Sequence, residues 1–478
     1  MTEQTRSTDR TRLVVIGAGP GGYAAAFLAA DMGMDVAVVD PAPNPGGVCL
    51  YRGCIPSKAL LHVARVIDES RRAADWGVKF AEPAIDLDRM RAWKDDVVEK
   101  LTGGLGQLTR RRKIRYIRGR AAFAGATSLE IETEDGKRHG LEFEHAILAT
   151  GSRPVALSGF PENSDRLLDS TSALDLQDVP RRLLVVGGGY IGLELGSVYA
   201  ALGSKVTVVE MMPSLLPGVD KDLVRPLAKK LQRELDEILL ETRVAEVKEQ
   251  KNGLKVRLDG KEVDKPERLF DKVLVSVGRR PNSENLGLEK TRIRIDEAGF
   301  VRVDERLRTA EPTIYAIGDI VGQPMLAHKA SHEGRTAVEA IAGHKVAFEP
   351  AAIPAVVFTD PEVAWCGSTE DEAKAQGRKV AVARFPWAAS GRAMTLGRDD
   401  GLTKLVIDPD TERILGVGIV GPGAGELIAE GVLAVEMAAL AGDLRLSIHP
   451  HPTLSETMME AAEVFFGQST HVYRPKRR

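Results

Sequence analysis

Two cysteines stand close together in a glycine-rich stretch, and such a pair could do redox chemistry. Cys49 and Cys54 lie within GGVCLYRGCIPSKAL, and the third cysteine of the chain is Cys366. Apolar side chains at helical spacing follow the pair as far as Gly77, which predicts a helix whose N-terminus lies at the cysteines. A helix N-terminus stabilises a thiolate, which is the reactive form of cysteine.

A disulfide between Cys49 and Cys54 would close a very small loop, which adds little stability, so we expect its value to be redox. The alternative is a zinc site, which would need two further cysteine or histidine ligands at suitable spacing. Cys366 lies far along the chain in VAWCGST, and we expect it to be a small buried apolar side chain. The sequence therefore favours a redox-active pair and no metal.

A second reactive group stands near the C-terminus, in HPHPTLSE. Imidazole can take up a proton near neutral pH, and a carboxylate bonded to its other nitrogen fixes the tautomer. His451 and Glu456 could form such a pair. The segment Thr453 to Glu456 also fits a capping box, in which the glutamate accepts the backbone N–H of Thr453. From the residues alone, both interpretations of Glu456 stay open.

An internal repeat predicts the elements that position these groups. Arg12–Asp40 and Arg182–Glu210 each run from a buried apolar strand through a glycine turn and a small-residue helix to a strand that ends in an acid. The glycines are Gly17, Gly19 and Gly22, and then Gly187, Gly189 and Gly192. In this pattern they allow a tight turn, the approach of a pyrophosphate and close helix packing, and the helix N-terminus attracts the phosphates. Two adenine dinucleotides are expected.

The acids at the strand ends, Asp40 and Glu210, could hydrogen-bond a ribose. NADP needs a cation for its extra phosphate, and Glu210 would repel that phosphate. The residues that follow Glu210, Met211 to Pro213, offer no cation. NAD is therefore favoured.

The chain of 478 residues is too long for one core. Thr313–Gly322 predicts a strand that ends at Gly318-Asp319, so the second dinucleotide-binding unit would be inserted in the first. We expect three domains: residues 1–155 with 279–350, residues 156–278, and residues 351–478. The last has strand patterns at 380–387, 403–408 and 414–420 and a helix from about Ala424 to Ala441, whose apolar tract Gly431–Ala441 we expect to be buried. The fold class is α/β with a C-terminal α+β domain.

The composition excludes several classes of protein. Net charge is -3 and aromatic content 5%, which gives no reason to expect nucleic acid or an anionic membrane as a partner. No apolar run is long enough for a membrane helix, and Met1–Arg12 is too polar for a secretory signal. A cytoplasmic location is expected.

Several motifs together resemble a known family, the class I pyridine nucleotide–disulfide oxidoreductases, and within it the dihydrolipoamide dehydrogenases. Beside both glycine fingerprints and the cysteine segment, they are ATGSRP (Ala149–Pro154), VGRRPN (Val277–Asn282), GDIVGQPMLAHKA (Gly318–Ala330) and HPHPTLSE (His449–Glu456). The resemblance implies a flavoprotein that oxidises dihydrolipoamide through a Cys49–Cys54 disulfide and FAD and reduces NAD. It also implies a lipoyl domain as partner.

The resemblance assigns roles to single residues. Cys49 would exchange with the dithiol, and Cys54 would contact the flavin. Lys58 would lie beside the flavin and pair with Glu194, although a solvated lysine and a chance acid are the plain alternatives. Glu194 lies in the apolar segment IGLELGSVY, where an unpaired carboxylate would be costly, so a partner is expected.

His451 would be the catalytic base and Glu456 its orienting carboxylate. In the family this last domain forms the dimer interface, and its histidine completes the other subunit's site, so a homodimer is implied. Further cofactor contacts are implied at Ala121, Thr150, Gly151, Ser152, Asp319, Met325, Leu326, Ala327 and His328 for FAD, and at Val244 and Gly278 for NAD.

Three positions depart from the common pattern: Tyr51 between the cysteines, Pro450 before His451, and Asp40 where glutamate is usual. Tyr51 could alter access to the disulfide. Two alternatives therefore stay open: a related flavin disulfide reductase for another dithiol, and a flavoprotein redox sensor without turnover.

Overall fold

The computed structural model describes residues 9–161 and 164–473. Most of the polar N-terminal segment discussed above, residues 1–8, lies outside these ranges. The chain divides into two compact units. Unit 1 comprises Met1–Ala59, Asp86–Ala156 and Val277–Glu349, and unit 2 comprises Leu60–Ile85, Leu157–Ser276 and Pro350–Arg478. No helix within the described ranges is both long and apolar enough to cross a membrane.

Unit 1 contains a six-stranded sheet. Strand β1 (Asp9–Ile16) pairs in parallel with β2 (Val36–Asp40) and β5 (Arg138–Leu148), and β2 pairs in parallel with β3 (Arg115–Gly125). Strand β4 (Ser128–Thr133) runs antiparallel to β3 and β5. The last strand, β16 (Ile314–Ala316), adds to β5 in parallel. The first sheet is therefore completed only after the chain has passed through residues 157–276.

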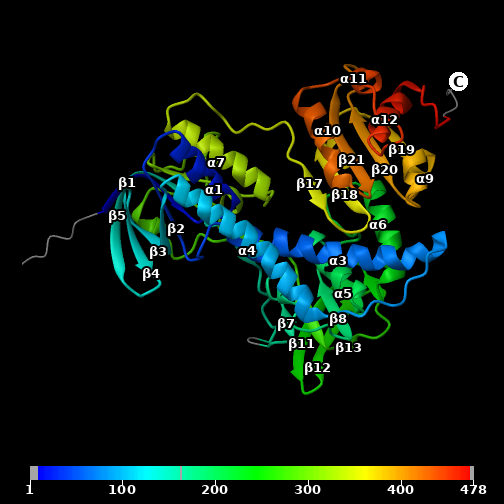
Figure 1. The fold of residues 1–478 in the computed structure, drawn as a ribbon, viewed down its shortest axis with the longest axis horizontal. Helices are drawn as coiled ribbons and strands as arrows, with labels where there is room; N and C mark the ends of the chain where they lie inside the picture. The colour runs from blue at the N-terminus through cyan, green and yellow to red at the C-terminus, as the bar shows by residue number, and fades with distance from the viewer. Residues whose placement is uncertain (1–8, 162–163, 474–478) are drawn as a thin grey trace, which may run out of the picture. The chain divides into compact units, whose positions relative to one another are not determined.

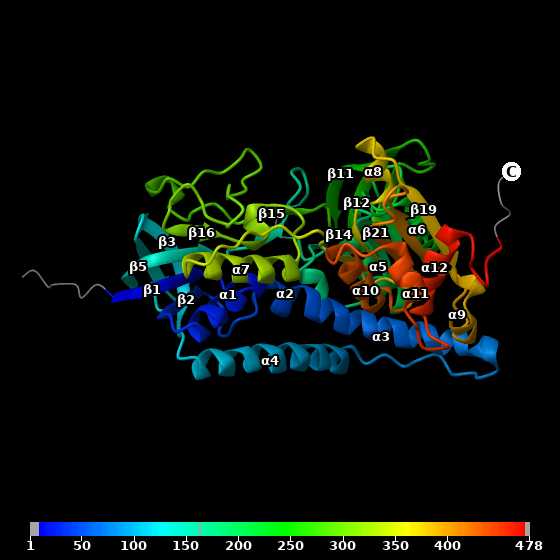
Figure 2. The same cartoon turned by 90° about the horizontal axis from the view of Figure 1, so that it is seen from above.

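Two helices, α1 (Pro20–Asp31) and α7 (Ala327–Ile341), lie side by side on this sheet (Figures 1 and 2). The face of α1 toward the sheet consists of Ala25, Ala26 and Ala29, all fully buried with the strand residues Leu13 and Val15. Small side chains let the helix approach the strands closely, as the repeat predicts. Unit 1 also contains the long helix α4 (Leu87–Arg111).

Unit 2 repeats the dinucleotide-binding pattern. Its parallel sheet has the order β10-β9-β8-β14-β7, and helix α5 (Tyr190–Ala201) follows the turn after β8. A separate antiparallel sheet follows. The strands are β7 (Leu167–Leu168), β8 (Arg182–Val186), β9 (Lys205–Val209), β10 (Glu237–Leu239) and β14 (Lys272–Val275), and in the second sheet β11 (Thr242–Gln250), β12 (Gly253–Gly260) and β13 (Glu267–Phe270). Helix α6 (Lys221–Glu234) lies between β9 and β10 in the chain.

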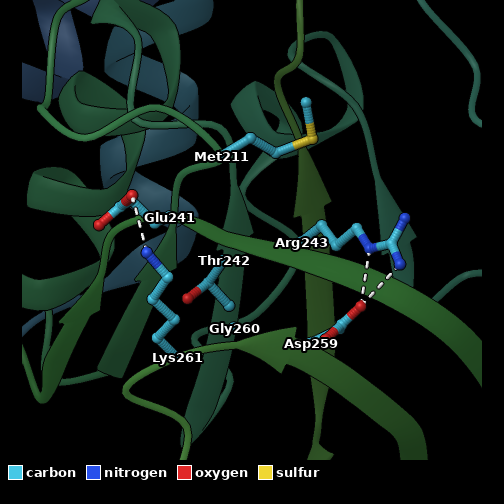
Figure 3. Close-up of a pocket in the computed structure, with 7 residues that line it drawn as sticks. All are labelled: Met211, Glu241, Thr242, Arg243, Asp259, Gly260 and Lys261. Carbon is cyan, nitrogen blue, oxygen red and sulfur yellow. Dashed lines mark hydrogen bonds and ion pairs between the residues drawn. The ribbon is translucent and has the colours of Figure 1, made fainter.

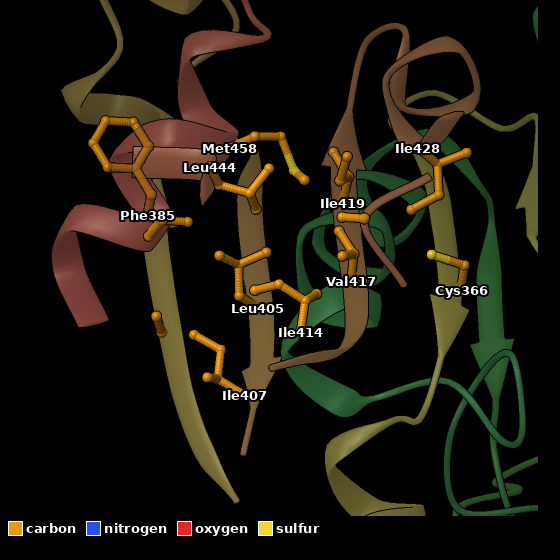
Figure 4. Close-up of a cluster of buried hydrophobic side chains, with 14 of the residues drawn as sticks. Cys366, Phe385, Leu405, Ile407, Ile414, Val417, Ile419, Ile428, Leu444 and Met458 are labelled. Atoms are coloured by element: carbon orange, nitrogen blue, oxygen red, sulfur yellow. The ribbon is translucent and has the colours of Figure 1, made fainter. Parts of the chain in front are cut away.

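The C-terminal part of unit 2 is an antiparallel sheet of order β17-β18-β21-β20-β19. Its strands are β17 (Ala355–Val357), β18 (Glu362–Gly367), β19 (Ala381–Pro386), β20 (Leu402–Ile407) and β21 (Ile414–Gly421). Helices α10 (Ala424–Glu436) and α12 (Glu456–Phe466) bury an apolar cluster against it (Figure 4). Cys366 belongs to this cluster and is 1% exposed, which confirms its prediction as a buried apolar side chain. Burial raises the pKa of Cys366 to about 12.

The predicted helix from Ala424 to Ala441 is too long. Helix α10 ends at Glu436, because Ala438 adopts a left-handed conformation (φ 54°), and a short helix α11 (Ala441–Leu446) follows. The expected burial of the tract is also wrong in part. Leu433 is 63% and Met437 is 72% exposed. These two side chains lie four residues apart, on one face of the helix.

The third glycine of each fingerprint can be tested by substitution. A Cβ atom at Gly22 would lie 2.0 Å from the carbonyl oxygen of Gly17, and one at Gly192 would lie 2.2 Å from that of Gly187. We expect Gly22→Ala to lower the free energy of unfolding by about 2 kcal/mol, because the turn after β1 must open. Gly103→Ala in α4 is the control, since a Cβ there meets no atom within 4 Å and should stabilise the helix by about 0.5–1 kcal/mol. Thermal unfolding measures both. An unchanged midpoint for Gly22→Ala would contradict the close packing.

Candidate active site

The cysteine pair lies where two helices meet in the sequence. Cys49 is part of the short helix α2 (Gly47–Arg52), and Cys54 is the first residue of α3 (Cys54–Arg72). A 3-10 turn, Ala73–Trp76, extends α3 to Gly77, whose φ of 88° ends it. The prediction of a helix N-terminus at the pair and a glycine stop is confirmed.

Helix α2 starts directly against the first fingerprint turn. The N–H of Gly46 donates to the carbonyl oxygen of Ala18 at 2.8 Å. A Cβ atom at Gly47 would lie 2.5 Å from Cα of Gly19, so the two backbones touch where neither residue has a side chain. The redox pair is thereby held next to the turn at which a pyrophosphate is expected.

The structure gives both cysteines as thiols, and their side chains are hydrogen-bonded to each other. This hydrogen bond, together with burial, raises the pKa of Cys49, while the charge of Lys58 opposes the shift. Cys54 stands at the start of α3, a position at which the helix dipole favours a thiolate. In the described parts of the chain, no three histidine, cysteine or acidic side chains gather in a way that could hold a metal ion.

Tyr51, the unusual residue between the cysteines, is tied to the preceding loop. Its hydroxyl donates to the carbonyl oxygen of Asn44 at 3.0 Å and accepts the N–H of Asn44 at 3.3 Å. The side chain thus braces the loop that leads into α2.

Asp40 lies at the end of β2, 8% exposed. Its carboxylate accepts the N–H of Ala18 at 2.7 Å and that of Ala42 at 2.8 Å. Burial raises the pKa of Asp40, against the effect of these two N–H groups. The acid therefore fixes the fingerprint turn as well as standing where a ribose would bind.

Two motifs that are far apart in sequence form one ribbon in unit 1. Strand β6 (Ser152–Pro154) pairs with β15 (Arg279–Pro281), and Thr150 donates through its hydroxyl to the carbonyl oxygen of Asn282 at 2.8 Å. Ser152 contacts both Asp319, through a hydrogen bond from its hydroxyl, and Arg279, whose Nε donates to that hydroxyl at 2.7 Å. Ser152 and Asp319, both predicted as FAD contacts, are thus brought together.

One buried pair at this place was missed by the sequence reasoning. Glu333, 2% exposed, accepts the N–H of Gly318 at 2.6 Å and pairs with Lys329 at 2.7 Å. Burial raises the pKa of Glu333, and Lys329 opposes the shift. The pair fixes the Gly318-Asp319 turn through the bond from the N–H of Gly318 to Glu333. The signal in the sequence was the spacing of four residues on the helix that follows.

The remaining predicted FAD positions lie in unit 1. Ala121 is a buried residue of β3, and Gly151 follows β5. The last four are at the start of α7, where Leu326 is the N-cap: Met325, Leu326, Ala327 and His328.

Glu210 repeats the geometry of Asp40 in unit 2. Its carboxylate accepts the N–H of Gly188 at 2.7 Å and that of Met212 at 2.8 Å. Val244, a predicted NAD contact, lies in strand β11, whose first residue Thr242 is hydrogen-bonded to the backbone of Glu210. Gly278, the other predicted NAD contact, belongs to unit 1. The residues that directly follow Glu210 carry no cation, but two cationic side chains from farther along the chain, Arg243 and Lys261, line a pocket with Met211 (Figure 3).

Glu194 is 3% exposed in helix α5. Its carboxylate accepts the N–H of Phe358 at 2.9 Å, so the expectation that this buried acid has a partner is confirmed. The partner that we expected, Lys58, lies in unit 1. The Lys58–Glu194 pair stays a prediction.

Glu456 contacts both of its predicted partners, His451 and the backbone N–H of Thr453. The predicted capping box itself is wrong, because helix α12 (Glu456–Phe466) begins at Glu456 with Ser455 as its N-cap. One oxygen lies 2.9 Å from Nδ1 of His451, and the other accepts the N–H of Thr453 at 2.7 Å. Partial burial raises the pKa of Glu456, but the N–H of Thr453 and the ring of His451 outweigh it, so that this pKa lies below its usual value. The His451 side chain is 75% exposed. An exposed imidazole held by a carboxylate can accept a proton from an incoming molecule.

Two family models match the chain. A model described as pyridine nucleotide-disulphide oxidoreductase matches residues 11–334, and the dimerisation domain of that family matches residues 353–462. The chain therefore belongs to the pyridine nucleotide-disulphide oxidoreductase family and is an enzyme. The predicted fold class, with its C-terminal dimerisation domain, is confirmed.

Several relatives similar to this chain are named dihydrolipoyl dehydrogenase. It is 48% identical to the dihydrolipoyl dehydrogenase of Vibrio cholerae over 98% of both chains. It is 49% identical to that of Haemophilus influenzae, over 98% of this chain and 97% of the relative. Among solved structures, LpdA from Mycobacterium tuberculosis has a TM-score of 0.88 and 28% identity, covering 95% of this chain and 99% of LpdA. The flavoprotein disulfide reductase RclA from Escherichia coli has a TM-score of 0.83 and 27% identity, with the same two coverages.

The double role of Glu456 predicts a pH-dependent contribution to stability. Its folded pKa is lowered, so the stabilisation is complete above the unfolded pKa and is lost as the pH falls through the folded pKa. We expect Glu456→Ala to lower the free energy of unfolding at neutral pH by about 1–2 kcal/mol. The difference from wild type should shrink on acidification. Thermal unfolding over a pH series measures it, with the exposed Glu99→Gln as control. A difference that does not vary with pH would argue against the hydrogen-bonded carboxylate.

Proposed function

We propose that the protein oxidises dihydrolipoamide to lipoamide and reduces NAD, with the Cys49–Cys54 pair as the group that exchanges with the dithiol. The observation that carries this proposal is the position of the pair, at the start of α3 and against the turn at Ala18 and Gly19. The choice of dithiol is supported by the dihydrolipoyl dehydrogenases to which nearly the whole chain is similar.

The proposed reaction begins at His451, which takes a proton from one substrate thiol. The resulting thiolate attacks the Cys49 sulfur of the Cys49–Cys54 disulfide, and Cys54 leaves as a thiolate. The second substrate thiol then displaces Cys49 from the mixed disulfide, so that lipoamide is released and the enzyme keeps two electrons as a dithiol. The raised pKa of Cys49 fits this role, since Cys49 ends as the protonated partner of the Cys54 thiolate.

FAD and NAD are part of the proposal. Bound FAD would supply the two-electron relay between the thiols and NAD. The fingerprint turn, Asp40, Ser152 and Asp319 would hold FAD. The chemistry of this set fits, because it joins a phosphate-binding helix N-terminus to carboxylates that can accept bonds from hydroxyl groups. The second fingerprint and Glu210 would hold NAD in the same way.

We further propose a homodimer that works with a lipoyl domain in the cytoplasm. Support for a dimer comes from the dimerisation domain and from exposed apolar side chains near His451 in the sequence. They are Leu433 (63%), Met437 (72%), Leu446 (73%) and Ile448 (98%). Water contact is unfavourable for such a group, and a second subunit would bury it. In this arrangement His451 would complete the site of the partner subunit.

A substrate comparison tests the function. FAD-loaded protein is assayed for reduction of NAD with dihydrolipoamide, and separately for NADH-dependent reduction of glutathione disulfide and of mercuric ion. We expect turnover with dihydrolipoamide alone, and none after Cys54→Ser. Turnover with another substrate alone would indicate a related reductase. A pair that is reduced and reoxidised without turnover would indicate a redox sensor.

His451→Gln tests the proposed base. We expect kcat for dihydrolipoamide oxidation to fall about 10²–10⁴-fold, the usual contribution of a positioned base. FAD content should not change, because His451 holds no cofactor in this proposal. His332→Gln, an exposed histidine of α7, is the matched control. Wild-type turnover in His451→Gln would refute the assignment.

Ile448→Glu tests the proposed dimer. A charge on this side chain would have to be buried in the interface, so we expect monomers in sedimentation analysis and loss of dihydrolipoamide turnover together. Ile295→Glu, at a 51% exposed isoleucine in unit 1, should leave both unchanged. Full activity in a monomeric Ile448→Glu variant would contradict the shared site.

A further inference from the structure

A pocket of about 450 Å³ lies beside the second fingerprint. Its lining comes from the loop after β9, from the start of β11 with the residue before it, and from the end of β12 with the residue after it: Met211, Glu241, Thr242, Arg243, Asp259, Gly260 and Lys261. The backbone joins this pocket to Glu210. The N–H of Thr242 donates to the carbonyl oxygen of Glu210 at 2.9 Å, and the N–H of Glu241 donates to that of Met212 at 3.2 Å. The pocket therefore adjoins the place where Glu210 would meet a ribose.

Two cationic side chains, Arg243 and Lys261, line the pocket, and each is paired with a carboxylate (Figure 3). Nε and Nη2 of Arg243 donate to one oxygen of Asp259 at 2.9 and 2.7 Å. Nζ of Lys261 lies 3.9 Å from a carboxylate oxygen of Glu241. The charges of these four side chains cancel, so the neighbouring Glu210 gives this region a net negative charge.

The backbone places both carboxylates. Arg243 and Asp259 are directly opposite each other in the register of β11 and β12. Glu241 has a φ of 47°, in the left-handed region that a residue with a side chain seldom adopts. All four side chains are more than half exposed (53–85%), and exposed ion pairs add little stability. The ion pairs can still affect the binding of a charged ligand, because that binding depends on the net charge of the site.

NADP differs from NAD by a phosphate on the adenosine ribose, and guanidinium and ammonium groups are the side chains that bind such a phosphate. We propose that Asp259 and Glu241 are specificity-determining residues, which neutralise Arg243 and Lys261 and so prevent them from binding the 2′-phosphate of NADP. The proposal rests on the use of NAD at this fingerprint, which is part of the proposed function. Glu210 repels the phosphate. Arg243 and Lys261 could offset this repulsion, but both are engaged in ion pairs.

The test measures binding of 2′,5′-ADP and of 5′-AMP to the full-length protein by calorimetry. These probes differ only in the phosphate at issue. We expect Asp259→Asn to tighten 2′,5′-ADP binding about fivefold to tenfold, because it frees a guanidinium for a charge-assisted hydrogen bond. Binding of 5′-AMP should change less than about twofold. Adding Glu241→Gln should increase the gain, and kcat/KM with NADP should rise in parallel.

Two controls separate this mechanism from a general effect of charge. Glu246→Gln removes a carboxylate from the same β11–β12 hairpin, where it faces Arg257 at 3.8 Å outside the pocket, and should leave 2′,5′-ADP binding unchanged. Adding Arg243→Gln to Asp259→Asn should abolish the gain, and high salt should reduce it. Equal gains from Glu246→Gln and Asp259→Asn, or no gain from Asp259→Asn, would overturn the proposal. If no variant binds 5′-AMP and the wild type does not use NAD, the proposed function itself fails.

Discussion

The chemistry depends on one close contact between two backbones. At Gly47 and Gly19 the start of the cysteine helix touches the first fingerprint turn, and a methyl group on Gly47 would lie 2.5 Å from the opposing Cα atom. Electron transfer from sulfur requires the thiols to be near the acceptor, and this contact fixes where the thiols are. The hydrogen bond from Gly46 to Ala18 and the hydrogen bonds of Tyr51 to Asn44 also stabilise this junction.

Carboxylates repeatedly fix the backbone at positions where the proposed chemistry also needs an acid. Asp40 and Glu210 each bind two backbone N–H groups of the loops around them, and both remain at the ends of their strands. Glu456 divides its two oxygens between the backbone N–H of Thr453 and an imidazole. A carboxylate has about four lone-pair positions, so it can organise a loop and still accept a bond from a ligand. A carboxylate that is buried needs a partner within the protein, and Glu194 and Glu333 each have one.

Much of this architecture could be predicted from the sequence, because its determinants are local. Glycine spacing, strand-terminal acids and the helix after the cysteines each follow from residues within one turn or one strand. What the sequence could not show depends on pairing across long distances. The cations near Glu210 come from β11 and β12, whose register no local pattern reveals, and the end of α10 depends on the conformation of Ala438. Glu456 was ambiguous for a different reason: its spacing suited a bond to His451 and a bond to the N–H of Thr453, and Glu456 makes both bonds without a capping box.

The late position of β16 has a consequence for synthesis on the ribosome. This strand completes the first sheet by pairing Ile314 with Ala146. Residues 157–276, which hold strands β7 to β14 of the parallel and hairpin sheets of unit 2, are translated between the two. The edge of β5 therefore has no β16 partner while that segment emerges, and an unpaired strand edge is a template for aggregation. Nascent chains would pass through a stage in which the second fingerprint can fold while the first sheet still lacks its last strand, which makes this interval the vulnerable one for chaperone capture.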